Sequence, residues 1–562
     1  MSMPNPPVRE TQSVCCAPYE ASAPLGWWQS DGAAPLFEAE AFCEAIRHIH
    51  KPFYIVKKGD SLGIARGGAV ALGPQPGADG ALPVVGWAPA APIRYLGDAG
   101  FCADYGLKYP YLCGSMAHGI TSVDILETLG RAGMLAFFGA AGLVPADVDR
   151  AIETVQWRLG EDTPYGFNLI HSPSESAVEE AVADLYVRRG VRLVEASAFL
   201  RLTAPLVRYR LHGIHCDPSG HVVTPNRVIA KVSRVELAEK FFAPPPERLL
   251  GQLVAAGHLT QEQAELASHV PVAQDITAEA DSGGHTDNRP AIALLPTLCA
   301  LRDRMQEEHG YPVPLRVGLG GGIATPASAA AAFAMGAAYI MTGTVNQACI
   351  ESGTSGVVRA MLAEARQADV TMAPAADMFE MGVAVQVLKR GTMFPMRAAK
   401  LFELYRQCGG MEEIPAEERV KLEETVFQIP LDEVWRQTKA FFMERDPRQV
   451  ERAEKDPKHR MALVFRWYLG QAVHWATRGE PSRKMDYQVW CGPAMGAFNE
   501  WVRGTFLERP ENRDVLTVAL NLLHGAAVIT RVNHLRGLGV ALSPDVRRVT
   551  PLERARIEEY LK

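Results

Sequence analysis

Between residues 111 and 343 short apolar runs alternate with amphipathic segments, and this alternation limits the fold more than any other feature of the chain. Eight runs have the length and composition of strands, and segments with helical spacing of their apolar residues lie between them. The predicted strands cover residues 111–116, 134–139, 166–170, 192–197, 227–232, 273–279, 315–319 and 338–343. Eight strands that alternate with helices predict a parallel (β/α)₈ barrel, with a doubly wound sheet as the competing arrangement.

Four segments are expected along the chain. Residues 1–25 are rich in Pro, Ser and Ala and predict a loose tail. In residues 26–105 short apolar stretches alternate with Gly/Pro turns, which predicts a small β-containing module. The barrel is assigned to 106–370, with a helical insertion at about 234–270 that we expect to form two helices around a Pro-Pro-Pro break. Residues 371–562 have mostly helical spacing and predict an α-helical C-terminal domain.

The composition indicates an ordinary folded protein. Of the 562 residues 48% are hydrophobic and 22% charged, and the formal net charge of -7 offers no general attraction for nucleic acid. The N-terminus lacks the basic start and apolar core of a secretory signal, and no charge-free apolar run reaches about 18 residues. We therefore expect a cytoplasmic protein that binds neither membrane nor nucleic acid.

The ten cysteines do not have the spacing of a structural metal site. His212, His215 and Cys216 form half of a possible ligand set, but no second half follows, so we expect no metal. Ser115 does not lie in the G-x-S-x-G motif of hydrolases, which argues against a serine nucleophile.

Two glycine-rich turns follow predicted strands seven and eight. Gly321 and Gly322 lead into a helix that starts at Thr325-Pro326, and Gly343 precedes Thr344. Glycines let backbone N–H groups approach a phosphate, and phosphate sites recur after these two strands in (β/α)₈ barrels. Neither turn matches a P-loop, and the acidic residue of a Rossmann fingerprint is missing. A phosphate site is thus favoured over two plain turns.

Three polar residues lie where the active site of such a barrel is expected. His285 stands in "ADSGGHTDNRP", directly after predicted strand six, and an imidazole there can donate a proton near neutral pH. Asn168 interrupts the apolar third strand and needs hydrogen-bond partners if it is buried. Lys231, near the end of strand five, fits either an anionic cofactor edge or a solvated rim equally well.

Together these motifs resemble the flavin-dependent barrel family that contains nitronate monooxygenases and flavin enoyl-acyl-carrier-protein reductases. That family has a Pro-Met-Ala stretch after strand one, here Ser115-Met116-Ala117 with serine in place of proline. Its G-x-N, Ala-Gly-Gly-His, Gly-Gly-Ile and Gly-Thr motifs are matched at Asn168, Gly283-Gly284-His285, Gly321-Gly322-Ile323 and Gly343-Thr344. The matches run in order over about residues 111 to 355.

Longer stretches, such as "EADSGGHTDNRP" and "DYQVWCGPAMGAFNEWV", resemble the PfaD-type, trans-acting enoyl reductases of polyunsaturated fatty acid and polyketide synthases. This resemblance implies bound FMN, NADPH as reductant, an enoyl thioester substrate and an acyl carrier protein partner. It implies a catalytic His285. The residues expected to bind the cofactor are Met116, Ala117, Asn168, Lys231, Asp281, Gly284, Gly321, Gly322, Gly343 and Thr344.

Three matters stay open at this point. One alternative function is a nitronate monooxygenase-like flavin oxygenase, and another is a non-catalytic docking component of a megasynthase. The oligomeric state is open, with a homodimer as one expectation. Acyl chain length is also open, because it depends on the shape of the pocket.

Overall fold

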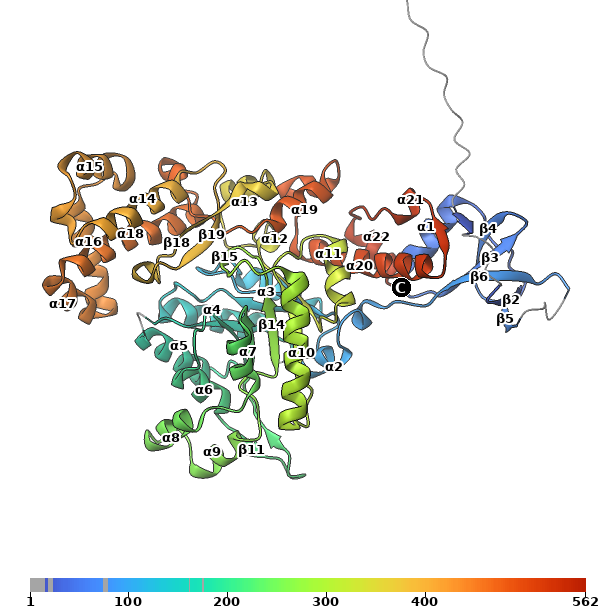
Figure 1. The fold of residues 1–562 in the computed structure, drawn as a ribbon, viewed down its shortest axis with the longest axis horizontal. Helices are drawn as coiled ribbons and strands as arrows, with labels where there is room; N and C mark the ends of the chain where they lie inside the picture. Colours follow the sequence, from blue (N-terminus) through green and yellow to red (C-terminus); the bar gives the residue numbers. More distant parts are fainter. Residues whose placement is uncertain (1–15, 19–23, 74–78, 161, 174–175) are drawn as a thin grey trace, which may run out of the picture. The chain divides into compact units, whose positions relative to one another are not determined.

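The computed structural model of the chain describes residues 16–18, 24–73, 79–160, 162–173 and 176–562 (Figure 1). The chain forms two compact units. Met1–Leu96 and Leu520–Lys562 make the first unit, and Gly97–Ala519 makes the second. The predicted tail, residues 1–25, lies mostly outside the described residues.

The second unit contains a closed barrel of eight parallel strands, so the predicted fold class is confirmed. Each predicted strand is present, within a few residues of its expected ends. The strands are β7 (Tyr111–Cys113), β8 (Leu135–Phe138), β9 (Gly166–Ile170), β10 (Leu193–Ser197), β13 (Arg227–Val232), β14 (Asp275–Glu279), β16 (Arg316–Gly320) and β17 (Ile340–Thr342). They pair in chain order, and β17 closes on β7. Such strands are buried on both faces, which explains their nearly continuous apolar sequence.

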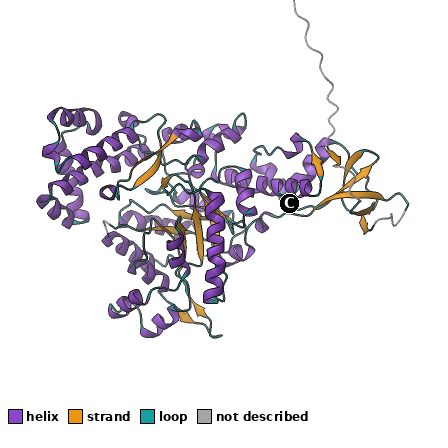
Figure 2. Cartoon of the chain, viewed as in Figure 1, coloured by secondary structure: helices purple, strands orange, loops and turns teal. Residues whose placement is uncertain are grey.

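Helices surround the barrel strands (Figure 2). They are α3 (Val123–Arg131), α4 (Pro145–Leu159), α5 (Ser176–Arg188), α6 (Ala204–Leu211), α7 (Val235–Phe242), α10 (Ala291–His309), α11 (Pro326–Ala334), α12 (Thr344–Gln347) and α13 (Gly356–Ala363), with α2 (Ala99–Asp104) before β7. Helix α3 illustrates how the sequence determines the start and the buried face of these helices. The Ser122 side chain accepts a hydrogen bond from the Ile125 N–H at the helix start, and Ile125 and Leu129 are buried on one face.

The insertion after β13 differs from the prediction of two helices. It contains three: α7, α8 (Glu247–Ala255) and α9 (Gln261–Ala267). A capping box between Thr260 and Gln263 starts α9, a signal that the sequence contains and the prediction overlooked. Helices α8 and α9 lie with the hairpin of β11 (His215–Cys216) and β12 (Val222–Val223) at the end of the barrel away from β15 (Figure 1).

A three-stranded antiparallel sheet lies over the other end of the barrel (Figure 1). Its order is β15 (Gly284–His285), β19 (Ala384–Leu388) and β18 (Val370–Pro374). The prediction of an α-helical domain over residues 371–562 therefore does not hold for residues 371–388, where β18 and β19 lie. The central strand pairs on one side with only two residues, and these lie about a hundred positions earlier in the chain, so no local hairpin pattern marks the sheet.

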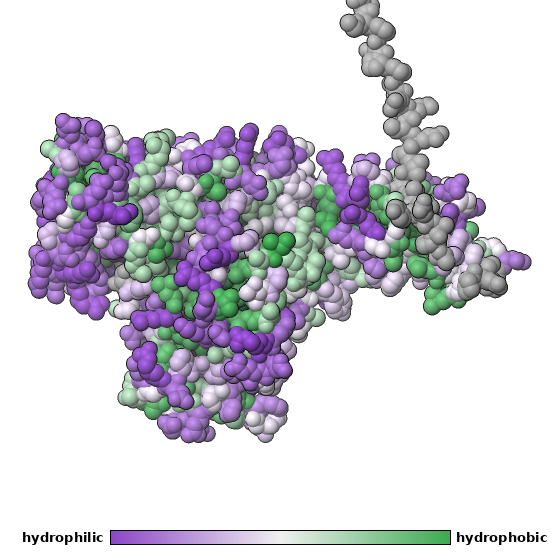
Figure 3. Space-filling model, in the orientation of Figure 1, coloured by the Kyte–Doolittle hydropathy of each residue, from purple (hydrophilic) through white to green (hydrophobic). Residues whose placement is uncertain are grey.

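Helices follow this sheet, as predicted. They are α14 (Phe394–Gln407), α15 (Ala416–Lys421), a π-helical segment (Leu422–Phe427), α16 (Leu431–Arg445), α17 (Pro447–Lys455), α18 (Pro457–Arg478) and α19 (Ala494–Val502). Phe394, Leu401, Phe465 and Tyr468 are fully buried in their common core. The outer surface over α15–α17 is largely hydrophilic (Figure 3).

The first unit holds the predicted β-containing module. Its antiparallel sheet has the order β4 (Ser61–Ala65), β3 (Phe53–Lys58), β6 (Leu82–Ala88), β2 (Gly26–Gln29) and β5 (Ala69–Leu72), and α1 (Ala39–Arg47) follows β2 in the chain. The last 43 residues, 520–562, belong to this unit. They include most of α20 (Val515–Gly537), then β20 (Val540–Leu542), α21 (Pro544–Arg547) and α22 (Arg554–Tyr560).

The predicted helical domain, 371–562, is thus divided between the two units. Two contacts explain the division. The buried Arg531 donates from Nη1 to the carbonyl oxygens of Ala45, Ile46 and His48, at 2.8 to 3.1 Å. Strand β1 (Cys16–Pro18) pairs with β20.

Helix α20 is long and apolar enough to cross a membrane by length and composition. However, 83% of its most apolar window is buried, which is also typical of a core helix. No other helix in the described part of the chain meets these criteria.

Candidate active site

Two adjoining cavities lie at the carboxyl ends of the barrel strands. The first, which we call the glycine cavity, is lined by Gly321, Gly322, Gly343 and Thr344. The second, the histidine cavity, is lined by Ala117, Asn168, Gly284 and His285. Residues that line both are Ser115, Met116, Lys231, Glu279, Gly283 and Trp490. Ten of the eleven predicted site residues therefore line these two adjoining cavities; Asp281 is the exception.

The glycine cavity has the features of a site for a ligand's polar group. Gly322 has φ +75°, and a Cβ atom built on Gly322 or Gly343 would meet no heavy atom within 4 Å, so both positions border open space. The Ser282 Oγ lines the cavity, is buried and has no hydrogen-bond partner among the described residues. Buried hydroxyls normally have partners, so this one is suited to a ligand. Ser282 and the exposed backbone fit a phosphate group.

Gly321 has a second reason to be glycine. A Cβ on this residue would lie 2.6 Å from the Ala280 carbonyl oxygen, in a backbone with φ +84°. The turn after β16 therefore packs directly on the end of β14, and any larger residue would move it.

Lys231 is held between two carboxylates in the barrel mouth. Its Nζ lies 3.3 Å from Glu279 Oε1 and 3.8 Å from Glu195 Oε2. Burial opposes the ammonium charge, but the two carboxylates outweigh it and raise the pKa of Lys231. The side chain is 18% exposed, so the interpretation as a solvated rim lysine does not hold.

Glu195 is fully buried beneath Lys231. Burial raises the pKa of this carboxyl, and Lys231 and Ser115 offset part of the effect. The Ser115 hydroxyl donates to Glu195 Oε2, and the Ser115 N–H lies 3.3 Å from both carboxylate oxygens. A proline, which the resembling family has at this position, would supply neither donor. The serine thus matches the buried glutamate of this chain.

His285 faces a carboxylate that the sequence did not indicate. Its Nε2 lies 3.1 Å from Asp377 Oδ2, on the loop between β18 and β19. Burial disfavours the imidazolium, but the attraction and hydrogen bond of Asp377 outweigh it and raise the pKa of His285. Desolvation raises the pKa of Asp377, but the attraction and hydrogen bond of His285 outweigh it and lower this pKa; 41% of the Asp377 side chain is exposed. Both pKa shifts favour an imidazolium–carboxylate pair at neutral pH.

The polar residues around His285 hold its loop in place. Asp281 Oδ1 accepts hydrogen bonds from Asn288 Nδ2 and Gln386 Nε2, both at 2.8 Å. Asp287 accepts two bonds of 2.9 Å from Arg234 and one of 2.6 Å from Ser233, which joins this loop to the one after β13. Asp281, predicted to bind the cofactor, is thus positioned to fix the backbone between β14 and His285.

The two glycines before His285 serve different contacts. A Cβ on Gly283 would lie 2.9 to 3.0 Å from the backbone of Cys491 and Gly492, so two chain segments touch there. Gly284 has φ +81° and pairs with Gln386 in β19. The close approach of Gly283 brings the segment with Trp490 to the wall of both cavities.

Asn168 finds the partners that its burial requires. Its Nδ2 donates to Ser197 Oγ at 2.7 Å and to the Glu195 carbonyl oxygen at 3.2 Å. The residue is 3% exposed and lines the histidine cavity. Its amide is therefore held rigidly in the cavity wall.

Several lining residues were not predicted. Glu195 and Glu279 had a signal, because a carboxylate inside a predicted buried strand needs an explanation. Asp377, Trp490 and Arg445 had none, because they come from segments 90 or more residues beyond His285. Among the described residues no group of three or more His, Cys, Asp and Glu side chains is arranged to hold a metal ion. His215 and Cys216 lie exposed on the β11 hairpin, away from these cavities.

One solved structure decides the family. The enoyl reductase domain of MlnA, from the macrolactin biosynthesis cluster of Bacillus amyloliquefaciens, is 42% identical with a TM-score of 0.75, and the match covers 79% of this chain and 100% of that one. This chain belongs to the PfaD-type enoyl reductase family. The resemblance noted in the sequence is thereby confirmed.

Curated proteins of this family agree. One of the polyunsaturated fatty acid synthase subunits of Thraustochytrium sp. is 51% identical over 448 residues, which are 78% of this chain and 30% of that protein. Polyketide biosynthesis protein PksE of Bacillus subtilis is 44% identical over 434 residues, 77% of this chain and 56% of PksE. The chain therefore spans between about a third and about half of the length of these relatives.

The helices beyond the barrel have a family match of their own. Residues 408–487 match the inserted helical domain of [acyl-carrier-protein] S-malonyltransferase. This segment covers α15 to α18, and two residues near it, Gln488 and Trp490, line the histidine cavity together with Gly470 and Val473 of α18.

Proposed function

We propose that this chain is an FMN-dependent enoyl reductase that acts in trans on enoyl-acyl-carrier-protein thioesters in polyunsaturated fatty acid or polyketide synthesis, with NADPH as hydride source. The observation that carries the proposal is the wall that the two cavities share. A glycine-lined cavity and the His285–Asp377 pair lie on either side of it in a member of an enoyl reductase family.

The residues present fit FMN. Gly322, Gly343 and Ser282 would surround its phosphate in the glycine cavity. Met116, Ala117 and Asn168 would line its ring system in the histidine cavity. Lys231, held protonated by its two carboxylates, would place a positive charge beside the electron-rich edge of the ring. Bound FMN, once reduced by NADPH, supplies the hydride that adds to the β-carbon of the enoyl thioester.

His285 would stabilise the charge that develops during this addition. Negative charge accumulates on the thioester oxygen, and a positioned donor lowers the barrier. The Nε2–H of the imidazolium points to Asp377. The N–H at Nδ1 would then donate to the thioester oxygen or protonate the α-carbon of the substrate. Asp377 keeps the imidazolium charged and fixes the orientation of the ring.

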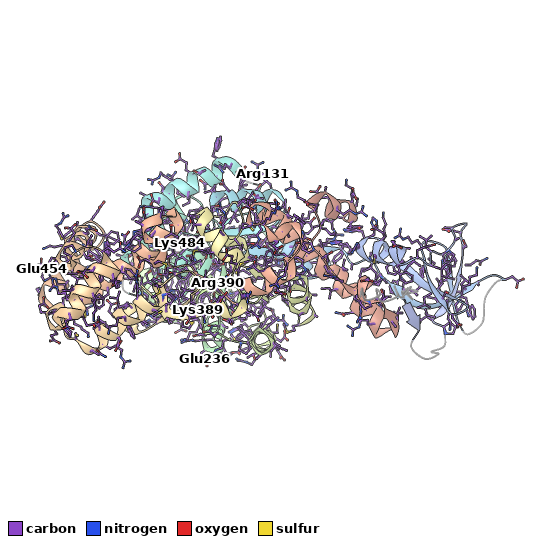
Figure 4. All side chains as sticks on the ribbon, turned by 90° about the horizontal axis from the view of Figure 1, so that it is seen from above. Arg131, Glu236, Lys389, Arg390, Glu454 and Lys484 are labelled. Carbon is purple, nitrogen blue, oxygen red and sulfur yellow. The ribbon has the colours of Figure 1, made fainter. Side chains whose placement is uncertain are left out.

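The proposed partner is an acidic acyl carrier protein. Lys389 and Arg390 follow β19, and Lys484 lies on the neighbouring segment 481–486; all three are labelled on the face seen in Figure 4. The Met393 N–H donates to the Met485 carbonyl oxygen at 2.7 Å, which joins these two segments. Such surface attraction is screened by salt. Raised salt should therefore increase the KM for a carrier-bound thioester and leave that for a pantetheine thioester unchanged.

The test is product analysis. The purified chain, loaded with FMN, is incubated with crotonyl-acyl carrier protein and NADPH, and the carrier protein is examined by mass spectrometry. A gain of two hydrogen atoms on the acyl group supports the proposal. An unchanged crotonyl group, with rapid oxygen consumption when a nitroalkane is added, would instead indicate a nitronate monooxygenase-like enzyme.

A further inference from the structure

An apolar groove adjoins the histidine cavity beside the barrel strands β10 and β13. It runs between the segments that follow β10 and β13 and the loop that joins β18 to β19. Its larger apolar lining residues are Phe199, Leu200, Val232, Leu237, Met378 and Val383. We call it the acyl groove, for the reasons that follow.

The groove is continuous with the candidate active site. Ala198, Lys231, Glu279 and His285 line both the groove and the histidine cavity. Ala198 has φ +57°, a conformation that residues other than glycine seldom adopt. Backbone outliers of this kind cluster at functional sites, and this one lies at the passage between the two spaces.

The floor of the groove is rigid and its outer end is open. The Phe199 ring stacks on His171 with centroids 5.2 Å apart and meets the edge of Phe241 at 6.1 Å. Leu200, the next residue, is 47% exposed although it is large and apolar. A buried aromatic floor that ends in an exposed leucine suits a flexible apolar ligand that reaches the surface.

Charge pairing argues against a nucleotide in this groove. Its three basic lining residues all face carboxylates: Lys231 faces Glu279 and Glu195, Arg234 faces Asp287, and His285 faces Asp377. None of these cations is left to turn toward the phosphates of a nicotinamide cofactor, and no glycine among the described residues lines the groove to bring backbone N–H groups close to them. A ligand without charge suits the groove better.

We infer that this groove holds the acyl chain of the enoyl thioester beyond the reacting double bond. The inference rests on the proposed reductase function and names the part of the site that recognises the substrate chain. The double bond then lies beside His285, at the passage that Ala198 and Lys231 share with the groove. Chains longer than four carbons extend between Phe199 and Met378 toward Leu200.

The test measures binding rather than turnover. Saturated butanoyl- and dodecanoyl-pantetheine are titrated into the FMN-loaded protein by calorimetry. The wild type should bind the dodecanoyl compound at least about tenfold more tightly, which requires burial of only about two of the added methylene groups. Ala384→Phe fills the groove from β19 and should abolish this preference. Met372 is an exposed residue of the neighbouring strand β18 and does not line the groove, so Met372→Phe is the matched control and should retain the preference.

Leu200→Asp supplies a second variant. Because Leu200 is half exposed, the change carries little folding risk, and it should reduce dodecanoyl affinity several-fold with butanoyl affinity unchanged. Equal affinity of the wild type for both compounds, or an intact preference in Ala384→Phe, would overturn the inference. So would loss of NADPH affinity in Ala384→Phe with unchanged acyl preference, because the groove would then hold the nucleotide. Chain-length preference without reduction of any enoyl thioester would support the groove and overturn the proposed function.

Discussion

His285 Nε2 lies 3.1 Å from Asp377 Oδ2, although 92 positions separate the two residues in the chain. The pair forms because β15, which carries His285, is a strand of the same sheet as β18 and β19, whose connecting loop carries Asp377. The sheet above the barrel thus links the proposed proton donor to the group that keeps it charged.

Asp377→Asn should change the pH dependence of thioester reduction. The carboxylate raises the pKa of His285, so its removal lowers that pKa, and the imidazolium is lost at a lower pH. In a plot of log(kcat/KM) against pH, the alkaline limb should shift to lower pH by about one pH unit. Activity near pH 6 should change less than activity near pH 8. An alkaline limb that stays in place would show that His285 does not supply the proton.

His285→Ala should separate cofactor binding from catalysis. The phosphate cradle lies in the other cavity, so FMN content after purification should match the wild type. Reduction of a crotonyl thioester should slow by about a hundredfold, which is typical for removal of a general acid. Wild-type turnover in this variant would make His285 a structural residue of the rim.

Gly343→Leu should lower FMN retention. No heavy atom lies within 4 Å of a Cβ at this position, so a leucine side chain there fills the glycine cavity. The measurement is the ratio of flavin to protein after gel filtration, and a fall of at least about tenfold in affinity is expected. Gly251→Leu on α8, where a Cβ also meets nothing within 4 Å, is the matched control. Equal flavin content in both variants would place the phosphate elsewhere.

Lys231→Met should destabilise the barrel. It leaves the carboxylates of Glu195 and Glu279 without their shared cation, and breaking a buried ion pair costs about 3 kcal/mol or more of unfolding free energy. The double variant Lys231→Met/Glu195→Gln should recover part of this loss. Exposed Lys455→Met serves as control in urea unfolding followed by circular dichroism. A double variant as unstable as the single one would show that Glu195 is not held charged by Lys231.

His524 should contribute to acid sensitivity of the first unit. This histidine is buried and shares a hydrogen bond of 2.9 Å with the Arg47 carbonyl oxygen, and burial lowers its pKa to about 4. The unfolded chain binds a proton below about pH 6.5, so this contribution is intact above that pH and is lost as the pH falls. The loss amounts to about 2 kcal/mol at pH 5. His524→Gln should therefore flatten the fall in unfolding free energy between pH 7 and pH 5. An unchanged slope would assign the acid sensitivity to other groups.

Much of the fold could be predicted because buried parallel strands have a characteristic sequence, a short run of mostly apolar residues. The runs that became β9, β13 and β16 are mostly apolar, and each ends where a loop of small or polar residues begins. Since a barrel gathers the carboxyl ends of its strands, placing Gly321, Gly343 and His285 together required only the strand count.

The rest could not be predicted because it depends on contacts between distant segments. Asp377 reaches the site through the sheet of β15, β19 and β18, in which β15 has only two residues. Trp490 reaches the site through the contact of Gly283 with Gly492. Neither contact has a local pattern. Gly283 lines both cavities, and its lack of a side chain also allows the backbone contact with Cys491 and Gly492.

The visible spectrum of the FMN-loaded protein tests the central claim most directly. Under anaerobic conditions NADPH is added first and a crotonyl thioester second. We predict that NADPH removes the absorbance of oxidised flavin and that the thioester restores it with formation of the saturated thioester. If NADPH bleaches the flavin but the thioester does not reoxidise it, the assignment as an enoyl reductase is contradicted.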